Sequence, residues 1–113
     1  MPSKTIKRIL CAKVYDVARE TPIDQLQFLS EQLGNQILAK REDLQPVFSF
    51  KLRGAYNKIA RLSVAEKKMV VVAASAGNHA QGVALAASQK RIKATIVLSL
   101  NSTIAFTKAR QPQ

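Results

Sequence analysis

The pattern of apolar and polar positions predicts helices and strands in alternation along the first half of the chain. In residues 5–18 the apolar side chains recur every three or four positions, which is the spacing of one helix face, and the Thr21-Pro22 pair ends this helix. The apolar positions are Ile6, Ile9, Leu10, Val14 and Val17. The next segments are a strand start with a short helix over 25–33, closed by Gly34 or Asn35, then a short strand over 36–40 and a polar loop over 41–46. A helix follows over 50–62 with Ser49 as its N-cap. A capping box at 63–66 opens a further short helix.

The clearest unit lies in the second half of the chain. Residues 69–73 form an apolar run, residues 77–90 are rich in alanine, and residues 93–98 form a second apolar run. A strand, a helix and a strand within about thirty residues make a βαβ unit, which requires parallel strands and a right-handed crossover. Residues 101–110 begin another helix. The predicted fold class is therefore α/β, with the βαβ unit at about 69–98.

Length and composition limit the class of protein. The chain has 113 residues and a mass of 12.4 kDa, so we expect one domain at most, and its 47% of hydrophobic residues are enough for a core. No apolar run approaches the roughly 18 residues that cross a membrane, and we expect no secretion signal. The single cysteine, Cys11, can form no internal disulfide, and we expect it to pack within the first helix. We therefore expect a reducing compartment, the cytoplasm.

The charge points to an anionic partner. Eighteen Lys and Arg against seven Asp and Glu give a net charge of +11, with a pI near 10.3. Such a balance suits nucleic acid, a membrane surface or a phosphorylated small molecule. However, the basic residues are scattered from Lys4 to Arg110, and the four Phe and two Tyr make a poor platform for stacking bases. Nucleic-acid binding is therefore the weaker expectation, and a generally basic surface is the simpler interpretation.

A turn that can hold an anion lies between the predicted strand at 69–73 and the helix that follows it. Small residues there let the backbone approach a ligand, and the free N–H groups of the first helical turn favour negative charge. The run lacks the Lys-Ser/Thr pair of a P-loop and the glycine spacing of a dinucleotide fingerprint, so a carboxylate or a small phosphate fits better. The interpretation that Asn78 and His79 only cap the helix is equally consistent with the spacing. The residues of this turn are Ser75, Ala76, Gly77, Asn78 and His79.

A lysine stands at the start of the helix predicted over 50–62. Lys51 falls in the first turn beside apolar neighbours, where positive potential and partial burial favour the neutral amine that a lysine nucleophile needs. The alternative is a solvated surface charge, which is the commoner role of a lysine at a helix start. His79 has no second His or Cys at the spacing of a metal site, so we expect no bound metal.

Three stretches of the sequence resemble one family of enzymes. They are residues 15–22, residues 40–56 with the runs Lys-Arg-Glu-Asp and Ser-Phe-Lys-Leu-Arg-Gly-Ala, and residues 74–84 with the run Ser-Ala-Gly-Asn-His-Ala-Gln-Gly. From about Ile9 to Leu98, the chain is similar to the N-terminal part of biosynthetic threonine dehydratases (threonine ammonia-lyases). These enzymes belong to the tryptophan-synthase-β-like, fold type II family of pyridoxal-phosphate enzymes.

The resemblance implies a role for each candidate residue. Lys51 would form the Schiff base with pyridoxal 5'-phosphate and remove the α-proton of the substrate, Phe50 would pack beside the cofactor ring, and Asn78 would bond to the ring hydroxyl oxygen. The turn from Ser75 to His79 would hold the substrate carboxylate, largely through backbone N–H groups. The implied reaction removes water from L-threonine, with L-serine as a poorer substrate, and yields 2-oxobutanoate and ammonia for isoleucine synthesis. Family members form homo-oligomers.

The resemblance also implies parts that this sequence lacks. The family binds the cofactor phosphate with a downstream glycine-rich loop, whereas the four glycines here are isolated, and a later Ser or Cys meets the pyridine nitrogen. We therefore expect residues 1–68 to be the opening section of the larger domain and residues 69–113 the start of the smaller one. We expect no regulatory domain and little or no activity from this isolated fragment. The alternative is a non-catalytic basic fragment that binds a partner chain or nucleic acid.

Overall fold

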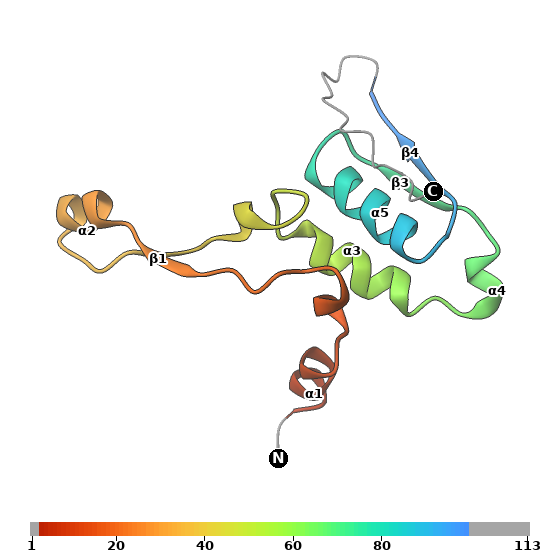
Figure 1. Cartoon of the computed structure of the whole chain (residues 1–113), viewed down its shortest axis with the longest axis horizontal. Coiled ribbons are helices and arrows are strands. Elements are labelled where there is room, and N and C mark those ends of the chain that lie inside the picture. Colours follow the sequence, from red (N-terminus) through yellow and green to blue (C-terminus); the bar gives the residue numbers. More distant parts are fainter. Residues whose placement is uncertain (1–2, 100–113) are drawn as a thin grey trace.

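The computed structural model describes residues 3–99. An arm of two strands and a helix projects from a body that holds most of the buried apolar residues (Figure 1). The elements in chain order are α1 (Lys4–Leu10), β1 (Ile23–Gln25), α2 (Gln27–Leu33), β2 (Leu38–Lys40), α3 (Lys51–Ala60), α4 (Val64–Lys67), β3 (Val71–Ala74), α5 (Asn78–Gln89) and β4 (Ala94–Val97), with 3₁₀ turns at Val14–Asp16 and Glu42–Leu44.

The βαβ unit predicted at about 69–98 is confirmed. β3 and β4 pair in parallel, with Val71 opposite Ala94, and α5 connects them. Alternate residues of β3 face the helix, because Val71 and Ala73 pack against the core whereas Val72 is exposed. The sheet is therefore covered by a helix on one face, and the fold class is α/β as predicted.

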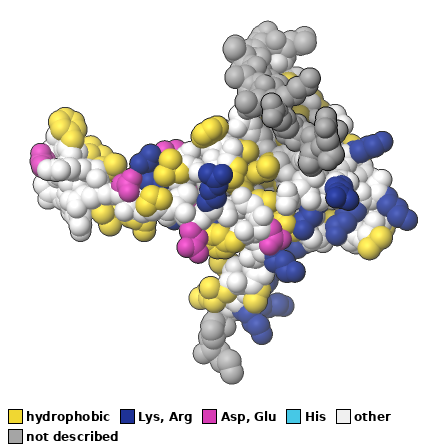
Figure 2. Space-filling view, viewed as in Figure 1, with side chains coloured by type: hydrophobic (Ala, Val, Ile, Leu, Met, Phe, Trp, Pro, Cys, Tyr) yellow, Lys and Arg dark blue, Asp and Glu magenta, His cyan; other side chains and the backbone are white. Residues whose placement is uncertain are grey.

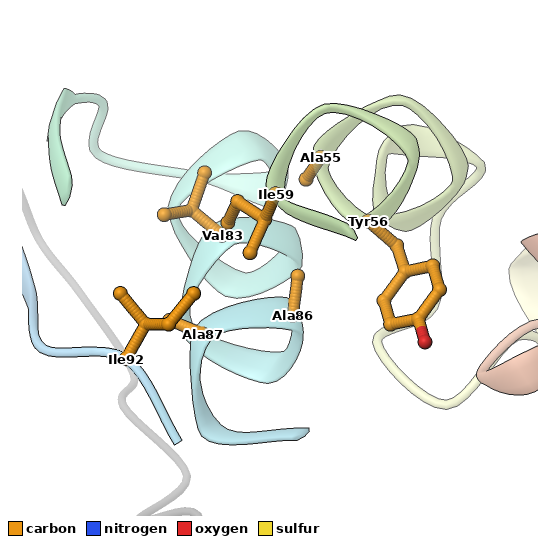
Figure 3. Close-up of a cluster of buried hydrophobic side chains, with 7 residues drawn as sticks. All are labelled: Ala55, Tyr56, Ile59, Val83, Ala86, Ala87 and Ile92. Atoms are coloured by element: carbon orange, nitrogen blue, oxygen red, sulfur yellow. The ribbon is translucent and has the colours of Figure 1, made fainter. Parts of the chain in front are cut away.

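The core lies between α3 and α5, which make the most extensive contact between any two described elements. Small residues on the facing side of α5 let the larger side chains of α3 pack close to its axis. The Tyr56 hydroxyl of α3 also donates a 2.6 Å hydrogen bond to the Asp16 carboxylate, which joins the first 3₁₀ turn to the body. The core residues are Ala55, Tyr56, Ile59, Val83, Ala86, Ala87 and Ile92 (Figure 3).

The single helix predicted over 5–18 is wrong beyond Leu10. α1 ends there, and the chain resumes as the 3₁₀ turn at Val14–Asp16. The apolar positions of this segment serve two surfaces, because Val17 packs against the core whereas Ile9 is 65% exposed. Cys11, which was expected to pack within the helix, is the exposed C-cap residue of α1.

The strand start, short helix and short strand predicted over 25–40 form the arm. β1 and β2 pair antiparallel, and α2 connects them. Gly34 ends α2 with a φ of 58°, the left-handed conformation that glycine adopts without strain. The buried Ser30 hydroxyl donates to the Leu26 carbonyl (2.7 Å) and accepts from the Ile37 N–H (3.0 Å). This side chain fastens the helix to the segment that leads into β2.

The start of α3 differs slightly from its prediction. The helix begins at Lys51, so the residue that flanks it is Phe50 rather than Ser49. The Ser49 hydroxyl nevertheless accepts the Lys51 backbone N–H at 3.2 Å. Ser49 therefore accepts the first N–H of the helix from the position before the N-cap residue Phe50.

The other predicted elements have clear outcomes. Ser63 and Glu66 make both hydrogen bonds of the capping box and open α4, as predicted. The loop predicted over 41–46 contains the 3₁₀ turn at Glu42–Leu44. The helix predicted over 101–110 lies outside the described residues. Within residues 3–99, no helix is long and apolar enough to cross a membrane.

Candidate active site

A partly buried ion pair fixes the segment that leads into α3. The Glu42 carboxylate accepts hydrogen bonds from Arg53 Nε (2.8 Å), Arg53 Nη2 (3.0 Å) and the Thr21 hydroxyl (3.0 Å). The side chains of Arg53 and Glu42 are only 24% and 16% exposed. The hydrogen bond from Arg53 is the main reason that the pKa of Glu42 falls to about 2. Glu42 is therefore charged at neutral pH and ties the first turns of α3 to the chain around Thr21.

Gln45 extends this network beneath the same segment. Its side chain is 1% exposed. Its amide oxygen accepts the Arg19 backbone N–H, and its Nε2 donates to the Arg19 carbonyl, both at 2.9 Å. Nε2 also donates to the Glu42 carboxylate at 3.3 Å. Because a buried amide is costly to leave unbonded, this network favours one arrangement of the chain before α3.

Lys51 follows directly after a constrained bend. Phe48 has a φ of 55°, a left-handed conformation that costs an ordinary residue about 1–2 kcal/mol. The Lys51 side chain is exposed, so the partial burial predicted for it is wrong. The reason is that its neighbour Phe50 is itself 62% exposed and does not cover the amine.

α5 crosses the start of α3 at Gly82. A Cβ atom added to this glycine would lie 3.1 Å from the Leu52 Cα and N atoms and 3.2 Å from the Lys51 carbonyl carbon. The absence of a side chain lets the two backbones come this close without a shift of either helix. His79 lies three residues earlier on the same face of α5. The crossing therefore brings His79 beside the start of α3.

A cavity of about 440 Å³ opens at this crossing. Phe50 and Lys51 from the start of α3 and His79 from the first turn of α5 line it. Three predicted site residues thus share one cavity, where a primary amine, an imidazole and an aromatic ring are available to a ligand. Such a set can bind a flat molecule and move a proton. The remaining lining residues are Arg53, Gly54 and Ala55.

The other predicted site residues lie at the same end of α5 but do not line this cavity. The turn follows the carboxyl end of β3, where ligands bind in parallel α/β folds. Ser75 is half-buried and accepts the Gly77 N–H at 3.3 Å, whereas Ala76, Gly77, Asn78 and His79 are exposed. Gly77 is the N-cap and no side chain caps the helix, so the interpretation that Asn78 and His79 only cap α5 is wrong. The first N–H groups of α5 have no carbonyl one turn before them and can bind an anion.

Sequence reasoning missed the residues that support the site. They are Glu42, Gln45, Arg53 and Gly82. Gly82 did carry a signal, because a glycine inside an alanine-rich helix costs about 1 kcal/mol relative to alanine and indicates close approach of another backbone. Glu42 and Arg53 stand in the runs that carry the family resemblance, but the supporting role of the three polar residues was not predictable, because most of their hydrogen bonds join positions 11 or more residues apart.

One protein family matches the part of the chain that forms this site. The family described as "Pyridoxal-phosphate dependent enzyme" matches residues 14–112, which is more than half of the chain. The chain belongs to this family of pyridoxal-phosphate-dependent enzymes. Its α/β fold is that of the fold type II members, and α1 precedes the matched segment.

The relatives are dehydratases and racemases of amino acids. The biosynthetic L-threonine dehydratase of Pasteurella multocida is 57% identical over 97 residues, which are 86% of this chain and 19% of that protein. The processed form of threonine deaminase isoform 2 from Solanum lycopersicum has a TM-score of 0.81 and 47% identity, covering 91% of this chain and 30% of that one. Maize serine racemase has a TM-score of 0.81 and 34% identity, covering 87% and 30%. The chain therefore spans less than a third of the length of each.

Proposed function

We propose that this chain supplies the lysine-bearing part of a threonine dehydratase that converts L-threonine into 2-oxobutanoate and ammonia. The observation that carries the proposal is the position of Lys51. Lys51 is the first residue of α3, lines a cavity together with Phe50 and His79, and lies beside the N-terminus of α5. The 57% identity to the P. multocida enzyme supports L-threonine as the substrate. The proposal includes L-serine as a poorer substrate.

The residues present suit pyridoxal phosphate. Lys51 offers an exposed primary amine that can join an aldehyde carbon, and Phe50 offers an aromatic ring on the same cavity wall. Asn78, in the first turn of α5, offers an amide for the ring hydroxyl. When bound, the cofactor supplies the electron sink for charge that develops at the substrate Cα. The four glycines of the sequence are isolated, so the proposal assigns no phosphate cradle to these residues.

The remaining residues would bind the substrate and move its proton. The N–H groups at the start of α5 would hold the substrate carboxylate, because a helix N-terminus favours negative charge. The Lys51 amine would remove the proton from Cα. A base held close to the reacting atom contributes several kcal/mol to the rate. The residues proposed for the carboxylate are Ser75, Ala76, Gly77, Asn78 and His79.

The proposal also divides the chain between two domains. We propose that residues 1–68 belong to a larger domain and residues 69–113 to a smaller one. The contact at Gly82 would then lie where the two domains meet, with Lys51 on one side and the turn before α5 on the other. Cofactor capture by these 113 residues would be weak and turnover slight, because no cradle holds the phosphate. The cytoplasm is the proposed compartment, because Cys11 is exposed and free.

Cofactor capture tests the proposal directly. The full chain is incubated with excess pyridoxal phosphate and reduced with borohydride, and its peptides are analysed by mass spectrometry. We expect the reduced pyridoxyl adduct on Lys51 and its loss in Lys51→Ala. Lys58→Ala is the matched control, because Lys58 is also an exposed lysine of α3 but lies two turns further along.

The pattern of labelling decides the outcome. Labelling spread evenly over the exposed lysines, unchanged by Lys51→Ala, would contradict the assignment of Lys51. Preferential labelling of Lys51 that survives Lys58→Ala would support it. Substrate specificity is tested separately, by comparing 2-oxobutanoate formation from L-threonine with pyruvate formation from L-serine in the full-length enzyme.

A further inference from the structure

A second cavity lies between α1 and the side of α3 that faces away from the core. Its volume is about 650 Å³, which is larger than that of the cavity at Lys51. The residues of α3 and its C-cap that line it share one side of the helix, because they are spaced by one, three and four positions. These residues are Arg53, Gly54, Asn57 and Arg61. α3 therefore packs on α5 with one side and bounds this cavity with the other.

The opposite wall of the cavity is largely apolar. Ile9 and Leu10 of α1 line it, together with Ala12 and Val14 from the segment that follows α1. The side chains of Ile9 and Leu10 are 65% and 76% exposed, so a ligand can reach both of them. Figure 2 shows hydrophobic and basic side chains close together on the segment around α1. An apolar group of a ligand would therefore gain by leaving water for this wall.

The cavity carries positive charge that no carboxylate of the described residues balances. Three arginines line it, and among residues 3–99 no acidic side chain does. Arg53 is paired with Glu42 at 2.8 Å, but Arg8 and Arg61 take part in none of the ion pairs within this part of the chain. Arg61 Nη2 donates to the Arg8 carbonyl at 3.5 Å, which brings these two arginines together. Two neighbouring guanidinium groups are well suited to a carboxylate or a phosphate.

The two ends of the cavity differ in chemistry. Arg53 and Arg61 stand two turns apart, which is about 12 Å along a helix axis. At the Arg53 end, the Tyr15 ring lies 5.2 Å from the Arg53 Cζ atom and also lines the cavity. The Arg61 end holds the two arginines that have no carboxylate partner within residues 3–99. A ligand that contacts both ends would therefore carry an anionic group at one end and an apolar group at the other.

We propose that this cavity binds a small organic anion, whose acidic group bonds to Arg8 and Arg61 and whose apolar body lies toward Tyr15. The volume of about 650 Å³ falls within the range of roughly 300–1,000 Å³ that is usual for small-molecule sites. The cavity shares Arg53 and Gly54 with the cavity at Lys51, but neither Lys51 nor His79 lines it. The proposal therefore goes beyond the proposed function and does not rest on it.

Titration with matched probes tests the proposal. The full chain is titrated at low salt with 4-phenylbutyrate, with the neutral analogue 4-phenyl-1-butanol and with inorganic phosphate, and binding is followed by amide NMR signals. The alcohol lacks the charge, and phosphate lacks the apolar body. We therefore expect 4-phenylbutyrate to bind at least about tenfold more tightly than either of them. The signals of Gly54, Asn57 and Arg61 should shift on binding, because these residues line the cavity.

Variants locate the bound anion. Arg8→Gln combined with Arg61→Gln should weaken 4-phenylbutyrate binding at least about tenfold and leave the affinity for the alcohol unchanged. Lys13→Gln combined with Lys58→Gln is the matched control, because it removes the same charge from exposed residues that do not line the cavity. Lys51→Ala should bind the probe as the parent chain does. Circular dichroism of each variant shows whether its helices are retained, and the comparison of the three probes needs no variant.

Several results would overturn the proposal. Equal affinity for 4-phenylbutyrate and the alcohol would show that the arginines do not select an anion. Equal weakening by the two double variants would reduce the effect to general attraction by a basic chain. Loss of binding in Lys51→Ala would place the probe in the cavity at Lys51. A chain that dimerises through this groove and binds none of the probes would show that a second copy occupies it.

Discussion

At the scale of single residues, Glu42 joins three parts of the chain. Its carboxylate accepts hydrogen bonds from Arg53 in α3, from Thr21 before the arm and from Gln45 in the loop between them. Lys51 lies two residues before Arg53, so the same contacts restrain the position of the lysine. The position of Lys51 therefore depends on the negative charge of the Glu42 carboxylate.

We expect acid to destabilise the chain through Glu42. Hydrogen bonding to Arg53 lowers the pKa of the Glu42 carboxyl from 4.5 to about 2. Because the folded pKa is the lower one, the stabilisation is fully present above pH 4.5 and is lost as the pH falls through 2. The loss should be on the order of 1–3 kcal/mol. Urea unfolding at a series of pH values between 7 and 2 measures it.

Two variants show whether this pH dependence belongs to Glu42. Glu42→Gln should be less stable at neutral pH, since Arg53 loses its partner, and should lose less stability in acid. Asp43→Asn is the control, because the side chain of Asp43 is 57% exposed and its pair with Arg41 lies at the surface. An acid response that Glu42→Gln leaves at full size would show that other carboxyls cause it.

At the scale of helices and strands, the site depends on how closely α3 and α5 cross. A Cβ atom added at Gly82 would lie 3.1 Å from the Leu52 backbone, so a side chain there requires the two helices to shift apart by a few tenths of an ångström. Gly54, by contrast, has no heavy atom within 4 Å of an added Cβ. Alanine substitutions at these two helical glycines can therefore be compared, one at the crossing and one with free space around it.

We expect Gly82→Ala to cost about 1–3 kcal/mol of stability, because α5 must move away from the α3 backbone. Gly54→Ala should be neutral or stabilise the chain by up to about 1 kcal/mol, since alanine is the better helix former. Thermal unfolding of both variants measures the difference. Equal effects at the two positions would mean that the crossing is looser than the structure indicates.

The elements were predictable where local chemistry decides them. The βαβ unit follows from two apolar runs around an alanine-rich helix, and the capping box and Gly34 mark helix ends by their own hydrogen bonds and dihedral angles. The helix over 5–18 was mispredicted because a helical period does not reveal that Ile9 and Val17 belong to different surfaces.

The sequence predicted the candidate residues of the site better than it predicted their tertiary contacts and burial. The runs around Lys51 and Asn78 identified both segments, but their meeting depends on the tertiary contact at Gly82. The expected burial of Lys51 failed for a related reason. Burial is decided by whatever polypeptide covers a residue, and local spacing carries no information about it.

At the scale of the whole molecule, charge is spread rather than concentrated. The net charge is +11, and Figure 2 shows Lys and Arg side chains on both the body and the segment around α1. Arg41 and Arg53 are paired with carboxylates. The Cζ atom of Arg53 lies 5.2 Å from the centre of the Tyr15 ring. The Tyr15 ring therefore already stacks against a guanidinium group. The surface therefore suits non-specific attraction better than base recognition.

We expect DNA binding to be weak and strongly dependent on salt. Phosphate contacts alone lose affinity steeply as counterions are added, so binding seen at 20 mM salt should disappear near 150 mM. Fluorescence anisotropy with duplexes of unrelated sequence measures this. Affinity that persists at 150 mM salt and differs between sequences would instead favour a nucleic-acid-binding role.

The clustering of the core in one stretch of chain has a consequence for how the molecule is made. All residues of the cluster between α3 and α5 come from Ala55 to Ile92. Contacts between residues close in sequence form quickly, and domains begin to fold while the ribosome is still at work. The nascent chain can therefore assemble the corner that holds Lys51 as soon as Ile92 has left the exit tunnel. The arm emerges earlier, but none of the residues of this core cluster comes from it.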